Sequence, residues 1–197
     1  PLAVGSESDP KGGGSDSPID DIIHGIIPND LSCFISVAAG TYSPSTTDER
    51  FPLPLQTNVT IFGEAGMDSV IIDAEQTGSV FSGVEKHDSH LWNLTITGGE
   101  APSGGGVYIL NSHVVIDSCR ISDNSGTAKP RNTLPGWDYS FRGGGGIYFG
   151  ADYWSVSSLN LIKSRIENNH SATYGGGVLC DTPGITIDED SGNGNIL

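Results

Sequence analysis

The chain has 197 residues, which is enough for one domain with a substantial core. Its net charge of −15 argues against nucleic acid and against an anionic membrane surface as partners, and no apolar run is long enough for a membrane-spanning helix. Glycine is abundant, with 28 residues, and only 17% of the residues are charged, which argues against a coiled coil or a long amphipathic helix.

Two signals mark the N-terminal region. Residues 1–16 are rich in Gly, Ser and Asp and are expected to form a flexible lead-in. Ser17 is a suitable N-cap, and Pro18 suits the first helical position. Four isoleucines then follow with the spacing of one helical face: Ile19, Ile22, Ile23 and Ile26. We therefore expect a short helix over 18–24.

After residue 31 the chain alternates apolar and polar residues and then repeats itself. The alternation, typical of β-strands, runs through Cys33-x-Ile35-x-Val37, Val59-x-Ile61 and Val70-x-Ile72. The segment LWNLTITGG (91–99) aligns with IDSCRISDN (116–124) and LIKSRIENN (161–169). Each is followed by a glycine triplet that opens an apolar segment: GGGVYIL from Gly104, GGGIYFG from Gly144 and GGGVLCD from Gly175. The alignment predicts an interior ladder of Ile96, Ile121 and Ile166.

The length of this repeat predicts the architecture. Ile96 and Ile121 are 25 residues apart and Ile121 and Ile166 are 45 apart, the excess falling in loop insertions at 126–142 and 150–155. A repeat this short cannot bury its own apolar side, so successive repeats must stack into a solenoid of parallel coils. Asn124 aligns with Asn169 at a corner, where stacked side chains can form hydrogen bonds along the solenoid. The glycine triplets accept positive φ at other corners.

These motifs resemble the right-handed parallel β-helix of the pectate-lyase-like superfamily. ISVAAGTYSP (35–44) and NVTIFGEAGMDSVIID (58–73) resemble the first coils of bacterial and archaeal extracellular β-helix proteins, and the glycine-triplet segments resemble their generic repeats. The resemblance implies an all-β solenoid over 17–197, capped at its N-terminal end by the helix over 18–24, in a secreted or cell-surface protein. It does not specify an activity, because the superfamily includes lyases, hydrolases, epimerases, adhesins and structural proteins.

Two arginines are candidates for chemistry. Arg120 and Arg165 align on an outward position of neighbouring repeats, with Glu167 beside them. The resembling lyases cleave acidic polysaccharides with an Arg or Lys and with Ca²⁺ held by Asp or Glu on an outer strand face. That likeness makes Arg120 and Arg165 candidate catalytic cations and makes Glu167 or Asp123 candidate metal ligands. Ordinary surface ion pairs would explain the same residues.

Other candidate sites are weaker. Clustered carboxylates of a hydrolase do not recur on neighbouring repeats. Asp188, Asp190 and Asn193 place oxygen ligands around a glycine and are weak candidates for Ca²⁺, although no cofactor is required by the sequence. His87-x-x-His90 lacks the accompanying pattern of a zinc enzyme. The three cysteines occupy apolar-alternating positions and are expected to be buried core thiols: Cys33, Cys119 and Cys180.

Aromatic residues predict a glycan-binding surface. Tyr108 and Tyr148 align as outward neighbours, Trp137 and Tyr139 lie in the first loop insertion, and Trp154 lies in the second. Aromatic faces flanked by hydrogen-bonding groups suit carbohydrate rings, although packing of these loops on the solenoid wall is an alternative. Three asparagines stand in glycosylation sequons, which matter only if the source glycosylates: Asn58, Asn93 and Asn169.

The sequence thus favours a non-catalytic extracellular or cell-surface module that binds polysaccharide or surface glycan, mediates adhesion or builds a surface structure. The alternative is a Ca²⁺-dependent polysaccharide lyase. The last strand of the repeat pattern, Ile185-Thr186-Ile187, is followed only by turn residues up to Asn195-Ile196-Leu197. We expect the C-terminal end of the solenoid to be covered, either by further chain or by head-to-tail docking of a second subunit, which would build a filament.

Overall fold

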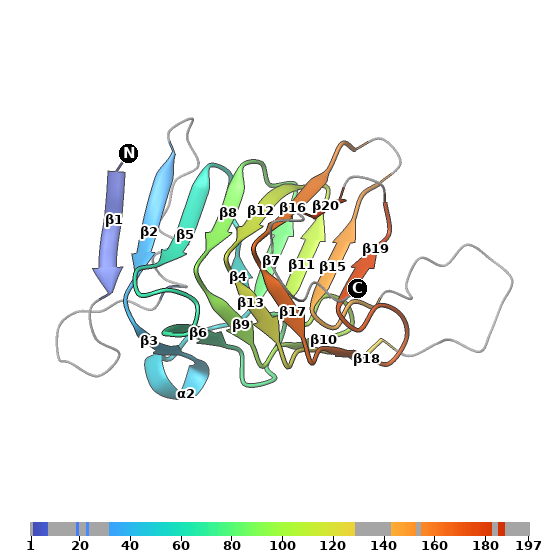
Figure 1. Ribbon diagram of the computed structural model, residues 1–197, viewed down its shortest axis with the longest axis horizontal. Coiled ribbons are helices and arrows are strands. Elements are labelled where there is room, and N and C mark those ends of the chain that lie inside the picture. The colour runs from blue at the N-terminus through green and yellow to red at the C-terminus, as the bar shows by residue number, and fades with distance from the viewer. Residues whose placement is uncertain are drawn as a thin grey trace, which may run out of the picture.

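The computed structural model describes residues 2–7, 19, 23, 32–128, 143–152, 155–182 and 185–187. Short strands stack side by side along the long axis of the molecule, from β1 and β2 at one end to β19 at the other (Figure 1). All strand pairs among the described residues are parallel; successive coils pass through sheets A, B and C in turn, and the coils from β8 onward also contribute a strand to sheet D. The fold is therefore an all-β solenoid, as the repeats predicted.

Four sheets form the faces of the solenoid. Sheet A contains, in order, β1 (Leu2–Glu7), β2 (Cys33–Val37), β5 (Val59–Gly63), β8 (Ser89–Trp92), β12 (His113–Asp117), β16 (Ser158–Ile162) and β20 (Ile185–Ile187). Sheet B contains β3 (Gly40–Tyr42), β6 (Val70–Asp73), β9 (Thr95–Thr97), β13 (Arg120–Ser122) and β17 (Arg165–Glu167). Sheet C contains β4 (Leu53–Pro54), β7 (Phe81–Val84), β11 (Val107–Leu110), β15 (Ile147–Gly150) and β19 (Val178–Cys180). Sheet D contains β10 (Glu100–Ala101), β14 (Ser125–Gly126) and β18 (His170–Ser171).

The core lies inside the coils and is built from ladders of equivalent residues. Ile121 pairs in register with Ile96 on one side and with Ile166 on the other, and all three are buried. The predicted interior ladder is confirmed. Leu91, Ile116 and Leu161 form a second buried ladder on sheet A. Alternation along each strand sends the remaining side chains to the outer face of the solenoid.

The predicted asparagine ladder is also present. Asn124 Nδ2 donates to Asn169 Oδ1 at 3.0 Å, and Asn169 Nδ2 donates to the carbonyl oxygen of Ile121 at 2.8 Å. The left-handed conformation falls one residue earlier in each coil, at Asp123 (φ 58°) and Asn168 (φ 55°). The side chains of Asn124 and Asn169 thereby stay inside the corner, where they bind backbone groups of the neighbouring coil.

The glycine triplets make the corner before sheet C. The first glycine of each has positive φ: Gly104, Gly144 and Gly175. At the second glycine the coils come too close for a side chain, since a Cβ on Gly105 would lie 2.4 Å from the carbonyl oxygen of Ser125 and 2.8 Å from that of Gly145. The triplets are therefore needed both for backbone conformation and for close stacking.

We expect Gly105→Ala to lower the free energy of unfolding by about 1–3 kcal/mol, because the contacts are with backbone and cannot be relieved by a rotamer change. The matched variant is Gly176→Ala, where the nearest contact of the Cβ is 3.0 Å, to the carbonyl oxygen of Asn169. Urea denaturation followed by circular dichroism should show the larger loss for Gly105→Ala. Equal stability of Gly105→Ala and the wild type would contradict the close stacking.

The N-terminal region differs in part from expectation. A flexible lead-in was expected over 1–16, but residues 2–7 form β1, which pairs in parallel with β2 at the edge of sheet A. Of the helix expected over 18–24, only Ile19 and Ile23 lie within the described residues; both are helical and buried, and Ile19 N donates to Glu49 Oε1 at 2.9 Å. A further helical turn, α2 (Pro44–Thr47), lies between sheets B and C.

The expectation of three buried thiols is correct for one cysteine. Cys119 is buried, and burial raises the pKa of its thiol to about 12. Cys33 is half-buried at the start of β2, and Cys180 is exposed at the end of β19. No strand is paired with the outer edge of β19 among the described residues, so Cys180 lacks the neighbouring coil that covers Phe149 on β15.

Within the described part of the chain, no helix is long and apolar enough to span a membrane.

Candidate functional site: an aromatic strip on sheet A

Large aromatic side chains gather on the outer face of sheet A. Phe34, Phe62 and Trp92 each stand beside a buried core residue of the same strand, so the alternation of the strand points them outward. Phe34 is 38% exposed, Trp92 is 40% exposed and Phe62 is half-buried. With His90, they form the aromatic strip, which crosses β2, β5 and β8.

Strand register sets the order within the strip. One row across the sheet contains Phe34, Thr60 and His90, and the next contains Ser36, Phe62, Trp92 and Asp117. The ring centroids of Phe62 and Trp92 are 5.8 Å apart, and those of His90 and Trp92 are 6.5 Å apart with the planes only 17° from parallel. The rings of Phe62, Trp92 and His90 therefore form one contiguous group, and Phe34 lies at the β2 end of the adjacent row.

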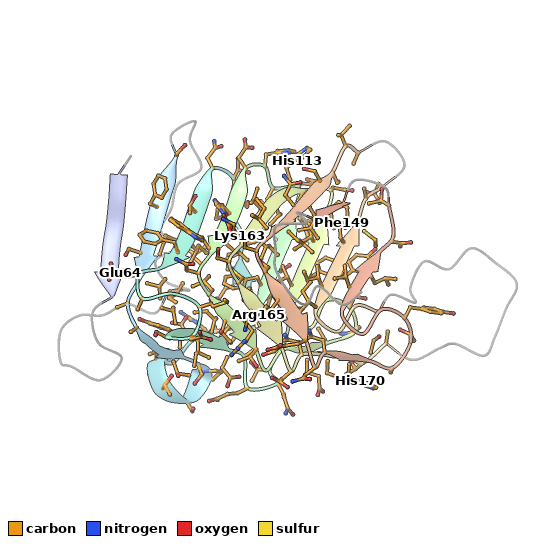
Figure 2. All side chains as sticks on the ribbon, in the orientation of Figure 1. Glu64, His113, Phe149, Lys163, Arg165 and His170 are labelled. Atoms are coloured by element: carbon orange, nitrogen blue, oxygen red, sulfur yellow. The ribbon has the colours of Figure 1, made fainter. Side chains whose placement is uncertain are left out.

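The strip is flanked by polar and acidic groups. Ser36 Oγ donates to Glu64 Oε1, which holds that carboxylate beside the Phe62 end of the row. At the other end, Asp117 Oδ1 accepts a hydrogen bond from Ser118 Oγ at 2.8 Å. Figure 2 shows Glu64 toward the end of the molecule that carries β2. Burial lowers the pKa of His90, with Asp117 opposing the shift, so the imidazole adds no positive charge to the strip at neutral pH.

The predicted alignment of Tyr108 with Tyr148 is confirmed, but the expected exposure of Tyr148 is wrong. Tyr108 and Tyr148 pair in register on the outer face of sheet C, and their rings stack with centroids 5.2 Å apart. However, Tyr148 is fully buried, and its hydroxyl donates to Asp181 Oδ2 at 3.2 Å. The ring of Tyr148 therefore cannot offer a face to a ligand, and Tyr108 is half-buried. Trp137, Tyr139 and Trp154 lie outside the described residues.

Arg120 and Arg165 lie on neighbouring strands, as the repeat alignment predicted, but their surroundings differ. Arg120 is held between two carboxylates, with Nη1 3.4 Å from Asp68 Oδ1 and Nε 3.1 Å from Glu167 Oε1. Arg165 pairs with Arg120 in register and is exposed on β17 (Figure 2). Thr95, which pairs in register with Arg120, is buried because the turn after β5 covers it, and its hydroxyl donates to Met67 O at 2.6 Å. Arg120 and Glu167 thus form the surface ion pair that was the alternative interpretation.

The geometry of the described residues gives little support to the predicted metal ligands. Among them, no three His, Cys, Asp or Glu side chains come together closely enough to hold a metal ion. His87 contacts His113, with ring centroids 5.2 Å apart, whereas His90 belongs to the aromatic strip. Asp123 is exposed at a corner with positive φ. Asp188, Asp190 and Asn193 lie outside the described residues, and so do Asn195-Ile196-Leu197.

The aromatic strip was missed by the sequence analysis, although a signal for it was present. In Ile61-Phe62 and in Leu91-Trp92 the aromatic residue follows a core residue directly, so alternation alone points it outward. The register between these strands was the missing information, because the coil from Val59 to Ser89 falls outside the aligned repeats.

Comparison with known proteins gives a family and no activity. The profile of a family described as "Protein of unknown function (DUF1565)" matches residues 4–190. No curated protein and no solved structure matches the chain.

Proposed function

The chain belongs to the DUF1565 family, and we propose that it is a non-catalytic module, secreted or displayed on the cell surface, that binds glycans through the aromatic strip of sheet A. The observation that carries this proposal is the exposure of Phe34 and Trp92 on a parallel sheet, in rows that also contain His90 and Phe62. A contiguous exposed apolar surface rimmed by polar groups is typical of a binding site.

The geometry of the strip favours a carbohydrate ligand. Adjacent strands of a sheet lie about 4.8 Å apart, close to the length of one sugar in an extended chain, so successive sugars can rest over successive strands. The apolar C–H faces of pyranose rings can stack on Phe62 and Trp92. Hydroxyl and carboxylate groups in the same rows, at Ser36, Thr60 and Asp117, can hydrogen-bond to sugar hydroxyls.

Sheet B supports the lyase alternative less well. Both carboxylates that contact Arg120 would have to be displaced before its guanidinium could neutralise a substrate carboxylate. The net charge of −15 also repels polyuronates. Among the described residues, Arg165 is exposed and no carboxylate is paired with it, but it lies on a different face from the aromatic strip.

We expect Trp92→Ala to weaken glycan binding by about tenfold or more, because stacking on the most exposed ring of the strip is lost. A glycan array would identify a ligand, and isothermal titration calorimetry would then compare the variants. Tyr174→Ala is the matched control, since Tyr174 is 66% exposed and lies outside the strip. Both variants should keep the melting temperature of the wild type within a few degrees.

Two results would overturn the proposal. One is glycan binding that Trp92→Ala and Tyr174→Ala leave equally intact. The other is release of unsaturated uronate from pectate or alginate with Ca²⁺, detected by ultraviolet absorbance and lost in Arg120→Ala or Arg165→Ala, which would establish the lyase instead.

A further inference from the structure

We propose that the aromatic strip selects polysaccharides with free amino groups, such as glucosamine polymers, over acetylated or acidic ones. This inference rests on the proposed function, because it names the ligand class of the same site. It follows from the charges that stand at the two ends of the strip.

Carboxylates flank the Phe62–Trp92 pair on both sides. Ser36 lies opposite Phe62 in the register and holds Glu64 by a hydrogen bond, while Asp117 lies opposite Trp92. The row therefore reads hydroxyl, aromatic, aromatic, carboxylate across β2, β5, β8 and β12, and Glu64, which directly follows β5, adds a second carboxylate at the hydroxyl end. Trp92 has Asp117 on the neighbouring strand, and Phe62 has Glu64 two residues further along its own segment.

This arrangement complements an amine-bearing sugar chain. An ammonium group is attracted both by a carboxylate and by the face of an aromatic ring. Ser36 and Asp117 are three strand intervals apart, about 14 Å, so an extended chain of a few sugars can place amines at both ends while its ring faces rest on Phe62 and Trp92. A polyuronate would bring carboxylates to the same positions and be repelled.

Among the described residues, no basic side chain forms an ion pair with Glu64 or Asp117. His90 lies beside Trp92, and burial favours its neutral form. The nearest described basic residue along the row is Lys163, an exposed residue that follows Ile162, one strand beyond Asp117. The net charge of −15 adds long-range attraction for a cationic polymer. The net charge of the whole chain therefore attracts the cationic polymer, whereas the aromatic strip supplies the selectivity for amine-bearing sugars.

The test is calorimetric titration of the intact chain with three hexasaccharides: glucosamine, N-acetylglucosamine and galacturonate. We expect the glucosamine hexamer to bind at least about tenfold more tightly than the acetylated one, with no binding of the galacturonate, and to weaken when ionic strength rises from about 0.05 to about 0.5 M. Asp117→Asn and Glu64→Gln should each weaken glucosamine binding by about three- to fivefold. Glu100→Gln removes one charge from an exposed position on sheet D and should leave binding unchanged.

The outcomes separate the two proposals. Equal binding of the acetylated and free hexamers, insensitive to Asp117→Asn and Glu64→Gln but lost in Trp92→Ala, would overturn the selectivity for amines and leave the glycan-binding function intact. Glucosamine binding that survives Trp92→Ala, or that falls equally in Glu100→Gln, would show only non-specific charge attraction and would overturn the inference. Failure of every glycan to bind the wild type would overturn both.

Discussion

Replacing Ile121 by alanine is expected to lower the free energy of unfolding by about 2–5 kcal/mol. Ile121 is fully buried at the centre of its ladder, between Ile96 and Ile166 of the adjacent coils. Truncation removes buried methyl groups and leaves a cavity that the stacked backbones on either side cannot close, because their spacing is fixed by the parallel hydrogen bonds. Urea denaturation monitored by circular dichroism measures the loss.

Val156→Ala provides the control for Ile121→Ala. Val156 is 79% exposed, so the same kind of truncation should change stability by no more than about 0.5 kcal/mol. A loss at Ile121 no greater than at Val156 would contradict the placement of the ladder inside the coils and with it the outward direction of the neighbouring residues.

The interior of the solenoid was predictable from the sequence because two constraints act together there. Strand alternation decides which face a residue occupies, and the repeat decides which residues become neighbours. Ile96, Ile121 and Ile166 satisfy both constraints, and Asn124 and Asn169 hold the same position in their repeats. Their contacts follow from the register alone.

Exposure on the outer face was not predictable in the same way. Alternation points Tyr148 away from the core, yet this ring is fully buried, stacks on Tyr108 and donates to Asp181 from another coil. Thr95 and Arg120 likewise meet the turn that contains Met67 and Asp68, which the repeats do not place. The direction in which a side chain points follows from its own strand. Whether that side chain is buried depends on turns that pass over it, and the sequence pattern does not specify the path of those turns.

The aromatic strip was only partly predictable from the sequence. The direction of Phe34, Phe62 and Trp92 follows from alternation, but their assembly into one surface needs the register of coils of unequal length. Between Val59 and Ser89 the coil is 30 residues long, and the repeat alignment begins only at residue 91. A site formed across coils could therefore be located only once the strands were paired.

The corner asparagine should be the position most sensitive to a change of charge. Asn124 is 1% exposed, its Nδ2 donates to the carbonyl oxygens of Ile96 and Ser122, and its Oδ1 accepts the amide of Gly99. In Asn124→Asp an oxygen replaces the donor and faces these carbonyl oxygens and Asn169 Oδ1. We expect a loss of about 3–5 kcal/mol at pH 7, the scale of an uncompensated buried charge.

The pH dependence identifies the cause of that loss. Burial and the facing carbonyls raise the pKa of the introduced carboxyl above its unfolded value of about 3.9. The charge penalty is therefore complete above the folded pKa and disappears as pH falls toward the unfolded pKa. The stability difference between Asn124→Asp and the wild type should thus be largest at pH 7 and shrink toward pH 4, leaving only the cost of the lost hydrogen bonds.

Asn168→Asp is the matched control for this measurement. Asn168 is exposed in the same corner, with φ of 55°, a conformation that aspartate also tolerates. Its replacement should change stability by no more than about 0.5 kcal/mol, with little dependence on pH. If Asn124→Asp were as stable as Asn168→Asp at pH 7, the side chain of residue 124 would have to reach water, and the hydrogen-bonded ladder could not be what holds this corner together.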